Sequence, residues 1–278
     1  MRIVMKPLLE DYKTIAIRTT HLEQFAMCPY KYKFEPPKFD NEEAMQFGTM
    51  VGAIMNAFRI WEDKWYALSD LIAKQHAEIS QYANLYKWLP NYREYMKDKE
   101  TICCELKMTY EIEMWAYLVI LSWSIDTLLI NQNGKYIITD DKTSKSERTQ
   151  EIMNTKIQKY LYPFLLAQYV GWETIESFDY LVFTKHALPK PKKDWGKSTR
   201  EGPRFWLWSY VPQQKYIEDY MFNLIDYYCR SVEDNLFTTK QDIGCFYCKL
   251  RSNWWCPVYS NSVPVKTDDS NTLQSLPF

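Results

Sequence analysis

The sequence lacks several features that would assign it at once to a broad class of proteins. It contains no run of about 18 or more apolar residues, so no membrane-spanning helix is expected. The stretch MRIVMKPLLEDYKT contains no apolar signal-peptide core, and this favours a cytoplasmic protein. The formal net charge is only −1, so overall charge does not indicate a polyanionic partner, and any charged binding surface must be local.

Glycine and histidine are also scarce, with 7 and 3 residues among 278, while hydrophobic residues make up 46%. That content is ample for one large domain or for a core with a smaller lobe. The seven cysteines are expected to stay reduced in the cytoplasm, where they serve as metal ligands, redox groups or core residues more often than as disulfides. The sequence does not specify an oligomeric state.

The most informative stretch is 121–143, which reads as two strands joined by a turn at 131–134. An Asn-Gly pair between two apolar runs is a strong hairpin signal. Alternate residues of a strand share a face, so Asp140 and Lys142 are predicted to point the same way, roughly 7 Å apart along the strand. Asp141 is predicted to point the other way, into solvent.

Asp126 lies on the first strand of this hairpin, so one face is expected to carry two carboxylates and an ammonium group. Carboxylate oxygens suit hard cations such as Mg²⁺, which can activate water and neutralise charge on a phosphate. The lysine can orient that water. The competing interpretation is a hairpin end with ordinary solvated charges, because the tripeptide D-x-K is common.

The rest of the chain predicts an α/β fold, with a mixed central sheet flanked by helices. A capping box at Thr20 and Glu23 predicts a short helix that ends near residue 28, followed by a loop or extended piece. We expect helices near 42–66, 68–89, 151–170 and 213–233, and strands near 101–120, 177–185 and 204–211. The organisation is a mostly helical part (1–100), a core (101–232) and a C-terminal loop and tail (233–278), forming one compact unit.

Three cysteines cluster near the C-terminus: Cys245, Cys248 and Cys256. A tetrahedral Zn²⁺ or a cubane cluster needs a fourth thiol, and Cys28, which also precedes a proline, is the best candidate. Spacing alone does not decide between zinc and [4Fe–4S]. The other cysteines fall in a predicted strand or helix and are expected to fill the core: Cys103, Cys104 and Cys229.

Several motifs line up in order between residues 19 and 257: Cys28-Pro29, Ser124-Ile125-Asp126, Asp140-Asp141-Lys142, Gln158-x-x-x-Tyr162 and the C-terminal cysteines. In this order they resemble the RecB-type branch of the PD-(D/E)XK nucleases. The likeness is greatest to the iron–sulfur exonucleases, which include CRISPR-associated members and the AddB nuclease domain. The resemblance implies a restriction-endonuclease-like core.

The resemblance also implies roles for individual residues. Asp126, Asp140 and the backbone carbonyl of Asp141 would bind Mg²⁺ or Mn²⁺, and Lys142 would position water or stabilise the transition state. Gln158 and Tyr162, four residues apart on one helix face, would orient the lysine or a phosphate. The four thiols would hold a [4Fe–4S] cluster, or alternatively Zn²⁺, as a clamp between the two ends of the chain.

One departure from the family pattern concerns a G-x-x-x-H helix motif. If Gly48 is aligned with the family glycine, Gly52 stands where a metal-binding histidine belongs, and Asn56 follows one turn later. The chain's own histidines do not fit the motif: His21, His76 and His186. The metal site is therefore expected to be one ligand short.

The expected partner is DNA, as single strands or ends. A basic stretch with one tryptophan would contact phosphates and unpaired bases, unless it is an ordinary solvated loop: Lys190, Lys192, Lys193, Trp195, Lys197 and Arg200. Tyr30–Lys33 is a second candidate.

The predicted function is a metal-dependent exonuclease in recombination, repair or phage or CRISPR-type DNA processing. If the protein is phage-encoded, it is expected in the host cytoplasm. Its possible partners are recombination or replication proteins. The alternatives are a catalytically weakened or inactive DNA-binding subunit with the same fold and a zinc-ribbon binding protein.

Overall fold

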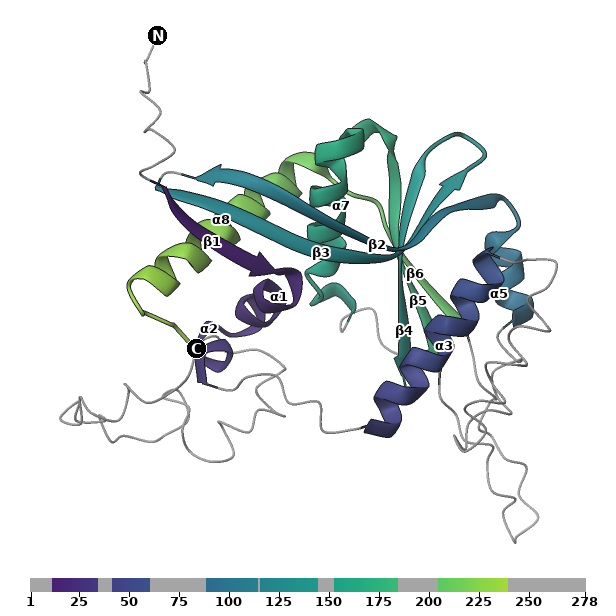
Figure 1. Ribbon diagram of the computed structural model, residues 1–278. Coiled ribbons are helices and arrows are strands. Elements are labelled where there is room, and N and C mark those ends of the chain that lie inside the picture. Colours follow the sequence, from purple (N-terminus) through teal and green to yellow (C-terminus); the bar gives the residue numbers. More distant parts are fainter. Residues whose placement is uncertain are drawn as a thin grey trace, which may run out of the picture.

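The chain forms a twisted β-sheet with helices against both faces (Figure 1), seen in a computed structural model that describes residues 12–34, 42–60, 89–114, 116–144, 153–184 and 205–239. The predicted fold class, a mixed sheet flanked by helices, is therefore confirmed. Within the described ranges, no helix has both the length and the apolar character needed to cross a membrane.

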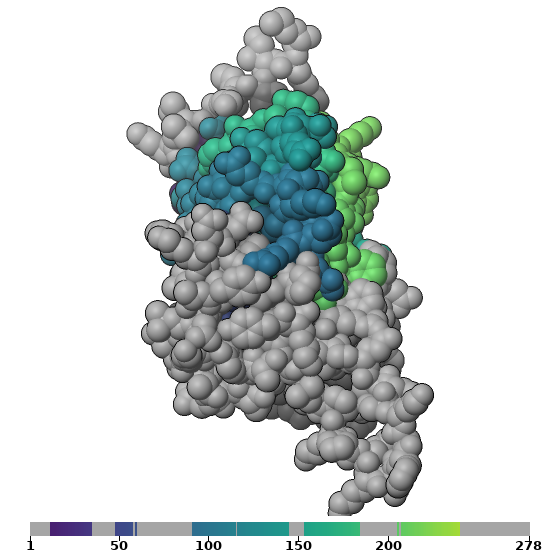
Figure 2. Space-filling view, turned by 90° about the vertical axis from the view of Figure 1, so that its right-hand side faces the viewer, coloured from purple at the N-terminus to yellow at the C-terminus, as the bar shows by residue number. Residues whose placement is uncertain are grey.

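The sheet has six strands in the order β1-β3-β4-β5-β6, with β2 along the other side of β3. Two neighbouring pairs, β1 with β3 and β4 with β5, are parallel, and the remaining pairs are antiparallel. From the side, residues of α5 and β2 (blue) and of the following strands (teal) form one continuous surface (Figure 2). The strand bounds are β1 Lys13–Arg18, β2 Lys99–Met114, β3 Tyr117–Asn131, β4 Tyr136–Ser144, β5 Ile175–Thr184 and β6 Phe205–Tyr210.

The helices divide the core into two parts, one on each face of the sheet. On one face α1, α7 and α8 pack over a large core that includes Phe25, Leu165 and Ile225. On the other face α3 and α5 cover the end of the sheet, where Met55 and Tyr92 are fully buried. The helix bounds are α1 Thr19–Met27, α2 Pro29–Phe34, α3 Glu42–Ile60, α5 Leu89–Met96, α7 Gln158–Val170 and α8 Gln214–Glu233, with a 3₁₀ turn η4 at Trp172–Thr174.

The predicted central hairpin is confirmed, and its turn follows from local chemistry. The Asn131 side-chain oxygen accepts hydrogen bonds from the backbone N–H groups of Asn133 and Lys135, at 2.9 and 3.0 Å. Gly134 has φ +74°, a left-handed conformation that glycine adopts at little cost. The turn sets the register in which Thr127 of β3 lies opposite Thr139 of β4.

Several predicted boundaries are wrong. The single strand expected over 101–120 is two strands, because the chain reverses between Met114 and Tyr117, where the sequence contains no typical turn residue. The expected extended piece after residue 28 is α2, a short helix. The helix expected from 151 begins as α7 at Gln158. Of the helix expected over 68–89, residues 68–88 lie outside the described residues.

The predicted capping box is also wrong. The N-cap of α1 is Arg18, and no side chain caps this helix end. Glu23 instead pairs with Lys156 at 3.3 Å, linking α1 to the segment before α7. The helix itself, ending just before Cys28, is as predicted.

Candidate metal-dependent active site

The site lies where β3 and β4 separate. These strands pair from Ile130↔Tyr136 to Thr127↔Thr139, and Asp126 and Asp140 are the next residues along each strand. Beyond this point β4 stays paired with β5 as far as Ser144↔Thr184. A hydrogen bond crosses the fork, from the backbone N–H of Asp141 to Oδ2 of Asp126 at 2.9 Å. The two aspartates predicted from sequence therefore flank one fork.

Asp140 and Lys142 point to the same face of β4, as alternation predicts. The Lys142 ammonium donates to Asp140 Oδ1 at 2.9 Å and lies 2.7 Å from Oδ2. The Asp140 side chain is only 2% exposed, and Oδ2 receives no hydrogen bond of good geometry from the described residues. Burial raises the pKa of Asp140, and the ammonium of Lys142 opposes that shift. For Lys142, burial lowers the pKa, but the hydrogen-bonded Asp140 carboxylate together with the charges of Asp126 and Glu23 outweighs it, so the net shift is upward.

Asp126 is the most perturbed carboxyl group at the fork. Burial, followed by the charges of Asp140 and Asp141, raises its pKa to about 7. Lys142 and the hydrogen bond from the Asp141 backbone act in the opposite direction without cancelling the shift. A nearby cation would favour the ionised form of Asp126, because its charge offsets both the loss of hydration on burial and the repulsion from Asp140 and Asp141.

The prediction that Asp141 is solvated is wrong. Its side chain is 10% exposed and forms a bidentate ion pair with Arg59 of α3, with both N–O distances at 2.8 Å. Arg59 also donates to Asn56 Oδ1 at 3.2 Å. The physical reason is that α3 packs over this face of β4. Strand alternation alone predicted that the face is solvent-exposed, but the helix covers it.

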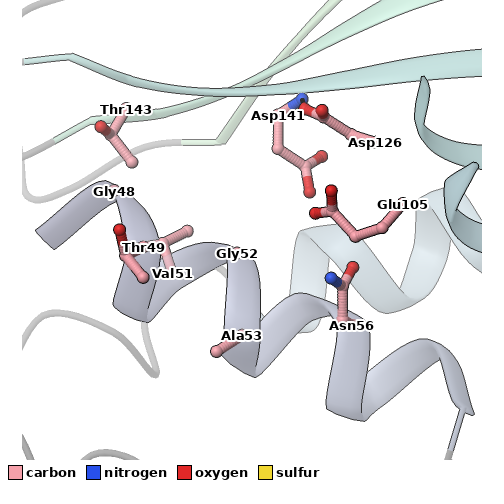
Figure 3. A pocket seen from close by; sticks show the side chains of 10 residues that line it. All are labelled: Gly48, Thr49, Val51, Gly52, Ala53, Asn56, Glu105, Asp126, Asp141 and Thr143. Carbon is pink, nitrogen blue, oxygen red and sulfur yellow. Dashed lines mark hydrogen bonds between the residues drawn. The ribbon is translucent and has the colours of Figure 1, made fainter. Parts of the chain in front are cut away.

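A cavity of about 460 Å³ lies between α3 and the fork (Figure 3). A Cβ atom at Gly48 would be 3.6 Å from Thr143 Oγ1, an ordinary contact, whereas at Gly52 it would meet no atom within 4 Å. The position where a family histidine was expected thus faces open space. The lining residues are Gly48, Thr49, Val51, Gly52, Ala53, Asn56, Glu105, Asp126, Asp141 and Thr143.

Glu105 is a residue of this cavity that sequence reasoning did not single out as functional. Cys104 pairs with Thr127 and Leu106 with Ile125, so Glu105 stands opposite Asp126. Its φ of +54° is unusual for a residue other than glycine and often marks a functional site. The only sequence signal was a glutamate in a regular polar alternation, which is not distinctive.

Gln158 and Tyr162 approach the fork from α7, on the face opposite α3. Gln158 donates to the Tyr162 hydroxyl at 3.4 Å and accepts from the Tyr180 hydroxyl at 3.5 Å. Burial, then the charges of Asp140 and Asp126, raises the pKa of Tyr162 far above its ordinary value. That influence indicates that the tyrosine hydroxyl and the carboxylates share one environment.

The donor set can be compared with the needs of a divalent cation. In the described part of the chain, no group of three or more His, Cys, Asp or Glu side chains is arranged to hold a metal ion. Two features nevertheless fit a cation: the buried Asp140 carboxylate, whose Oδ2 lies 2.7 Å from the Lys142 ammonium without a well-aligned hydrogen bond, and Asp126 at the same fork, whose pKa is raised. Hard cations that keep several waters need only one or two protein carboxylates.

Other predicted site residues lie outside the described ranges: Lys190, Lys192, Lys193, Trp195, Lys197, Arg200, Cys245, Cys248 and Cys256. Cys28 is described and is half-buried at the C-terminal end of α1. Nearby, the backbone N–H of Tyr30 donates to the carbonyl of Thr238 at 3.0 Å, so the segment after α8 runs beside the start of α2.

Comparison with known proteins identifies the class. The family model described as the PD-(D/E)XK nuclease superfamily matches residues 19–257, and the chain belongs to this superfamily, whose members are typically metal-dependent nucleases that act on DNA. No curated protein matches the chain. One similar solved structure, described as the crystal structure of SSO0001, is 15% identical over 88% of this chain and 86% of its own, with a TM-score of 0.42; a similarity at this level supports no functional conclusion.

Proposed function

We propose that this protein is a Mg²⁺- or Mn²⁺-dependent deoxyribonuclease that hydrolyses phosphodiester bonds at the β3–β4 fork. The observation that carries the proposal is the ion pair of Lys142 with the buried Asp140 carboxylate beside Asp126, which groups two carboxylates and an ammonium at one fork. Membership of the PD-(D/E)XK superfamily supports the same chemistry.

In this proposal Asp126, Asp140 and the backbone carbonyl of Asp141 hold the ion. When bound, the ion activates water and neutralises charge on the phosphate. Lys142 orients the attacking water and stabilises negative charge that develops on the phosphate oxygens. Gln158 and Tyr162 keep the ammonium group of Lys142 and the phosphate in position from the α7 side.

We further propose the RecB-type, iron–sulfur branch, with Cys28, Cys245, Cys248 and Cys256 as ligands of a [4Fe–4S] cluster; Zn²⁺ is the alternative. The Tyr30–Thr238 hydrogen bond supports this ligand set, because it brings the chain that leads to Cys245 beside Cys28. Five residues separate Thr239 from Cys245, and the six Cα–Cα steps between them can span about 20 Å, which is ample for a return to Cys28. Iron and zinc analysis of anaerobically purified protein distinguishes the two metals.

The substrate we propose is single-stranded DNA or DNA ends, bound in part by the basic segment 190–200, with Tyr30–Lys33 as a second contact. An exonuclease of this kind suits recombination, repair or phage or CRISPR-type processing, with proteins of those pathways as partners. The helical N-terminal part, the core and the C-terminal segment are proposed to form one compact unit in the cytoplasm.

A second candidate is a catalytically weakened or inactive DNA-binding subunit. Gly52, which faces open space, and the absence of a three-residue metal group in the described ranges favour it. This candidate predicts DNA binding without cleavage at any concentration of Mn²⁺.

The deciding experiment is Mn²⁺-dependent degradation of end-labelled single-stranded DNA by the full chain. Lys142→Ala is expected to abolish degradation, whereas the control Lys135→Ala, at the exposed hairpin turn, is expected to leave it unchanged. An equal trace from wild type and Lys142→Ala would reject the nuclease proposal. A circular single strand tests the finer claim, since an exonuclease leaves it intact.

A further inference from the structure

Arg59 makes a set of contacts that the proposed reaction does not use directly. Its two terminal nitrogens donate to the two carboxylate oxygens of Asp141, and its Nε donates to the Tyr92 hydroxyl at 2.6 Å. The Arg59 side chain is 0% exposed. Bidentate pairing fixes both the position and the plane of the carboxylate, and the Tyr92 hydroxyl fixes the guanidinium in turn.

Asp141 transmits this restraint to the metal site through its own backbone. Its N–H group donates to Asp126 Oδ2 at 2.9 Å, while its side chain is held by Arg59. The β3–β4 ladder ends at Thr127↔Thr139, so no strand pairing between β3 and β4 sets the separation of the fork here. The contacts of Asp141 with α3 on one side and Asp126 on the other span that gap.

A contribution to stability does not by itself explain the Arg59–Asp141 ion pair. Replacing a buried ion pair with packed apolar residues is often neutral or stabilising, because taking two charges out of water costs about as much as their attraction returns. A buried arginine–aspartate pair one residue from both Asp140 and Lys142 is better explained by the precise placement that two parallel hydrogen bonds provide.

We infer that Arg59 is a positioning residue for the metal site: by holding the Asp141 carboxylate, it orients the Asp141 peptide towards Asp126 and keeps the third carboxylate away from the cation. This inference rests on the proposed function. It assigns to α3 a part in the site that differs from supplying a metal ligand at Gly52.

The test uses the full chain and separates positioning from stability. The double variant Arg59→Met/Asp141→Leu removes both charges and keeps the Asp141 backbone N–H, so it is expected to unfold at about the wild-type temperature. Mn²⁺ binding, followed by calorimetry and by the electron paramagnetic resonance of free Mn²⁺, is expected to weaken about tenfold, because the N–H group of residue 141 is no longer held in the direction of Asp126. For DNA cleavage, kcat falls about tenfold or more and KM stays near the wild-type value.

Two further variants keep the test decisive. Arg59→Lys keeps the charge but loses the bidentate geometry, and its Mn²⁺ affinity and kcat are expected to lie between those of wild type and the double variant, even if the double variant folds poorly. Ser209→Ala removes one hydrogen bond, of 2.6 Å, to the buried Asp179 carboxylate on the same sheet and should change neither quantity.

The inference is overturned if the folded double variant, or Arg59→Lys where the double variant does not fold, matches wild type in both Mn²⁺ affinity and kcat. If wild type itself neither binds Mn²⁺ nor cleaves DNA, the proposed function fails instead, so the two failures are distinguishable.

Discussion

The two faces of strand β4 carry neighbouring aspartates whose carboxylates differ in their hydrogen bonding. Towards α7, Asp140 is buried against the ammonium of Lys142, which lies 2.9 Å from Oδ1 and 2.7 Å from Oδ2 but forms a well-aligned hydrogen bond to Oδ1 alone. Towards α3, Asp141 has both oxygens satisfied by Arg59. Consecutive residues of one strand thus carry a carboxylate with one well-formed hydrogen bond to its cation and a carboxylate with two.

This difference separates a group available for chemistry from a group used for architecture. A buried carboxylate with only one well-formed hydrogen bond can still gain contacts from a metal cation, whereas a bidentate ion pair is already complete.

The largest effect is expected from Asp140→Asn. This change removes the charge that holds the cation and Lys142, so kcat for Mn²⁺-dependent DNA cleavage should fall by about 10³-fold or more. Thermal unfolding should change little, because Lys142 is partly exposed and can reach solvent. A variant that retains more than a tenth of wild-type kcat would show that Asp140 does not serve the reaction.

The single variant Arg59→Met disrupts the ion pair on the face of β4 towards α3. It leaves Asp141 charged and buried without its partner, so the free energy of unfolding should fall by about 3–5 kcal/mol, as measured by urea denaturation. Adding Asp141→Leu should recover most of that loss. If Arg59→Met unfolds at the wild-type urea concentration, the ion pair does not compensate Asp141 as described.

A smaller effect is expected from pH acting on Asp126 in metal-free protein. Its pKa is raised from 3.8 to about 7 in the folded state, so the folded state binds this proton more tightly than the unfolded state between those values. Stability should therefore fall as pH rises from about 4 through about 7. Asp126→Asn should show a shallower fall, in urea denaturation at about pH 5 and about pH 8 with chelator present; equal slopes for the two proteins would contradict the assignment.

The smallest effect is expected from Gly52→Ala on α3. A Cβ atom there meets nothing within 4 Å, and alanine favours a helix over glycine by about 0.5–1 kcal/mol, so the variant should be slightly more stable. Thermal unfolding checks this prediction. A loss of stability would mean that the open space beside Gly52 is filled.

The hairpin and the facing of Asp140 and Lys142 could be predicted because both are local. An Asn-Gly turn sets the register, and strand alternation sets the face. The proximity of Asp126 to Asp140 was predicted from the same hairpin. The superfamily followed from the order of motifs and is confirmed by the family match.

Other features depend on contacts between distant residues, and no sequence pattern marks them. Arg59 and Asp141 are 82 residues apart, so the burial of Asp141 depends on how α3 packs. β1 joins the sheet by parallel pairing with β3, and its six residues show no distinctive pattern. Glu105 lies opposite Asp126 through an irregular register in β2, which strand alternation does not reveal.

The most direct test of the central claim is anomalous X-ray diffraction from crystals of the full chain grown with Mn²⁺. The account predicts an anomalous peak at the fork, within coordination distance of carboxylate oxygens of both Asp126 and Asp140, with the Asp141 carboxylate still paired to Arg59. A fully occupied peak elsewhere, or none at the fork at saturating Mn²⁺, would contradict it.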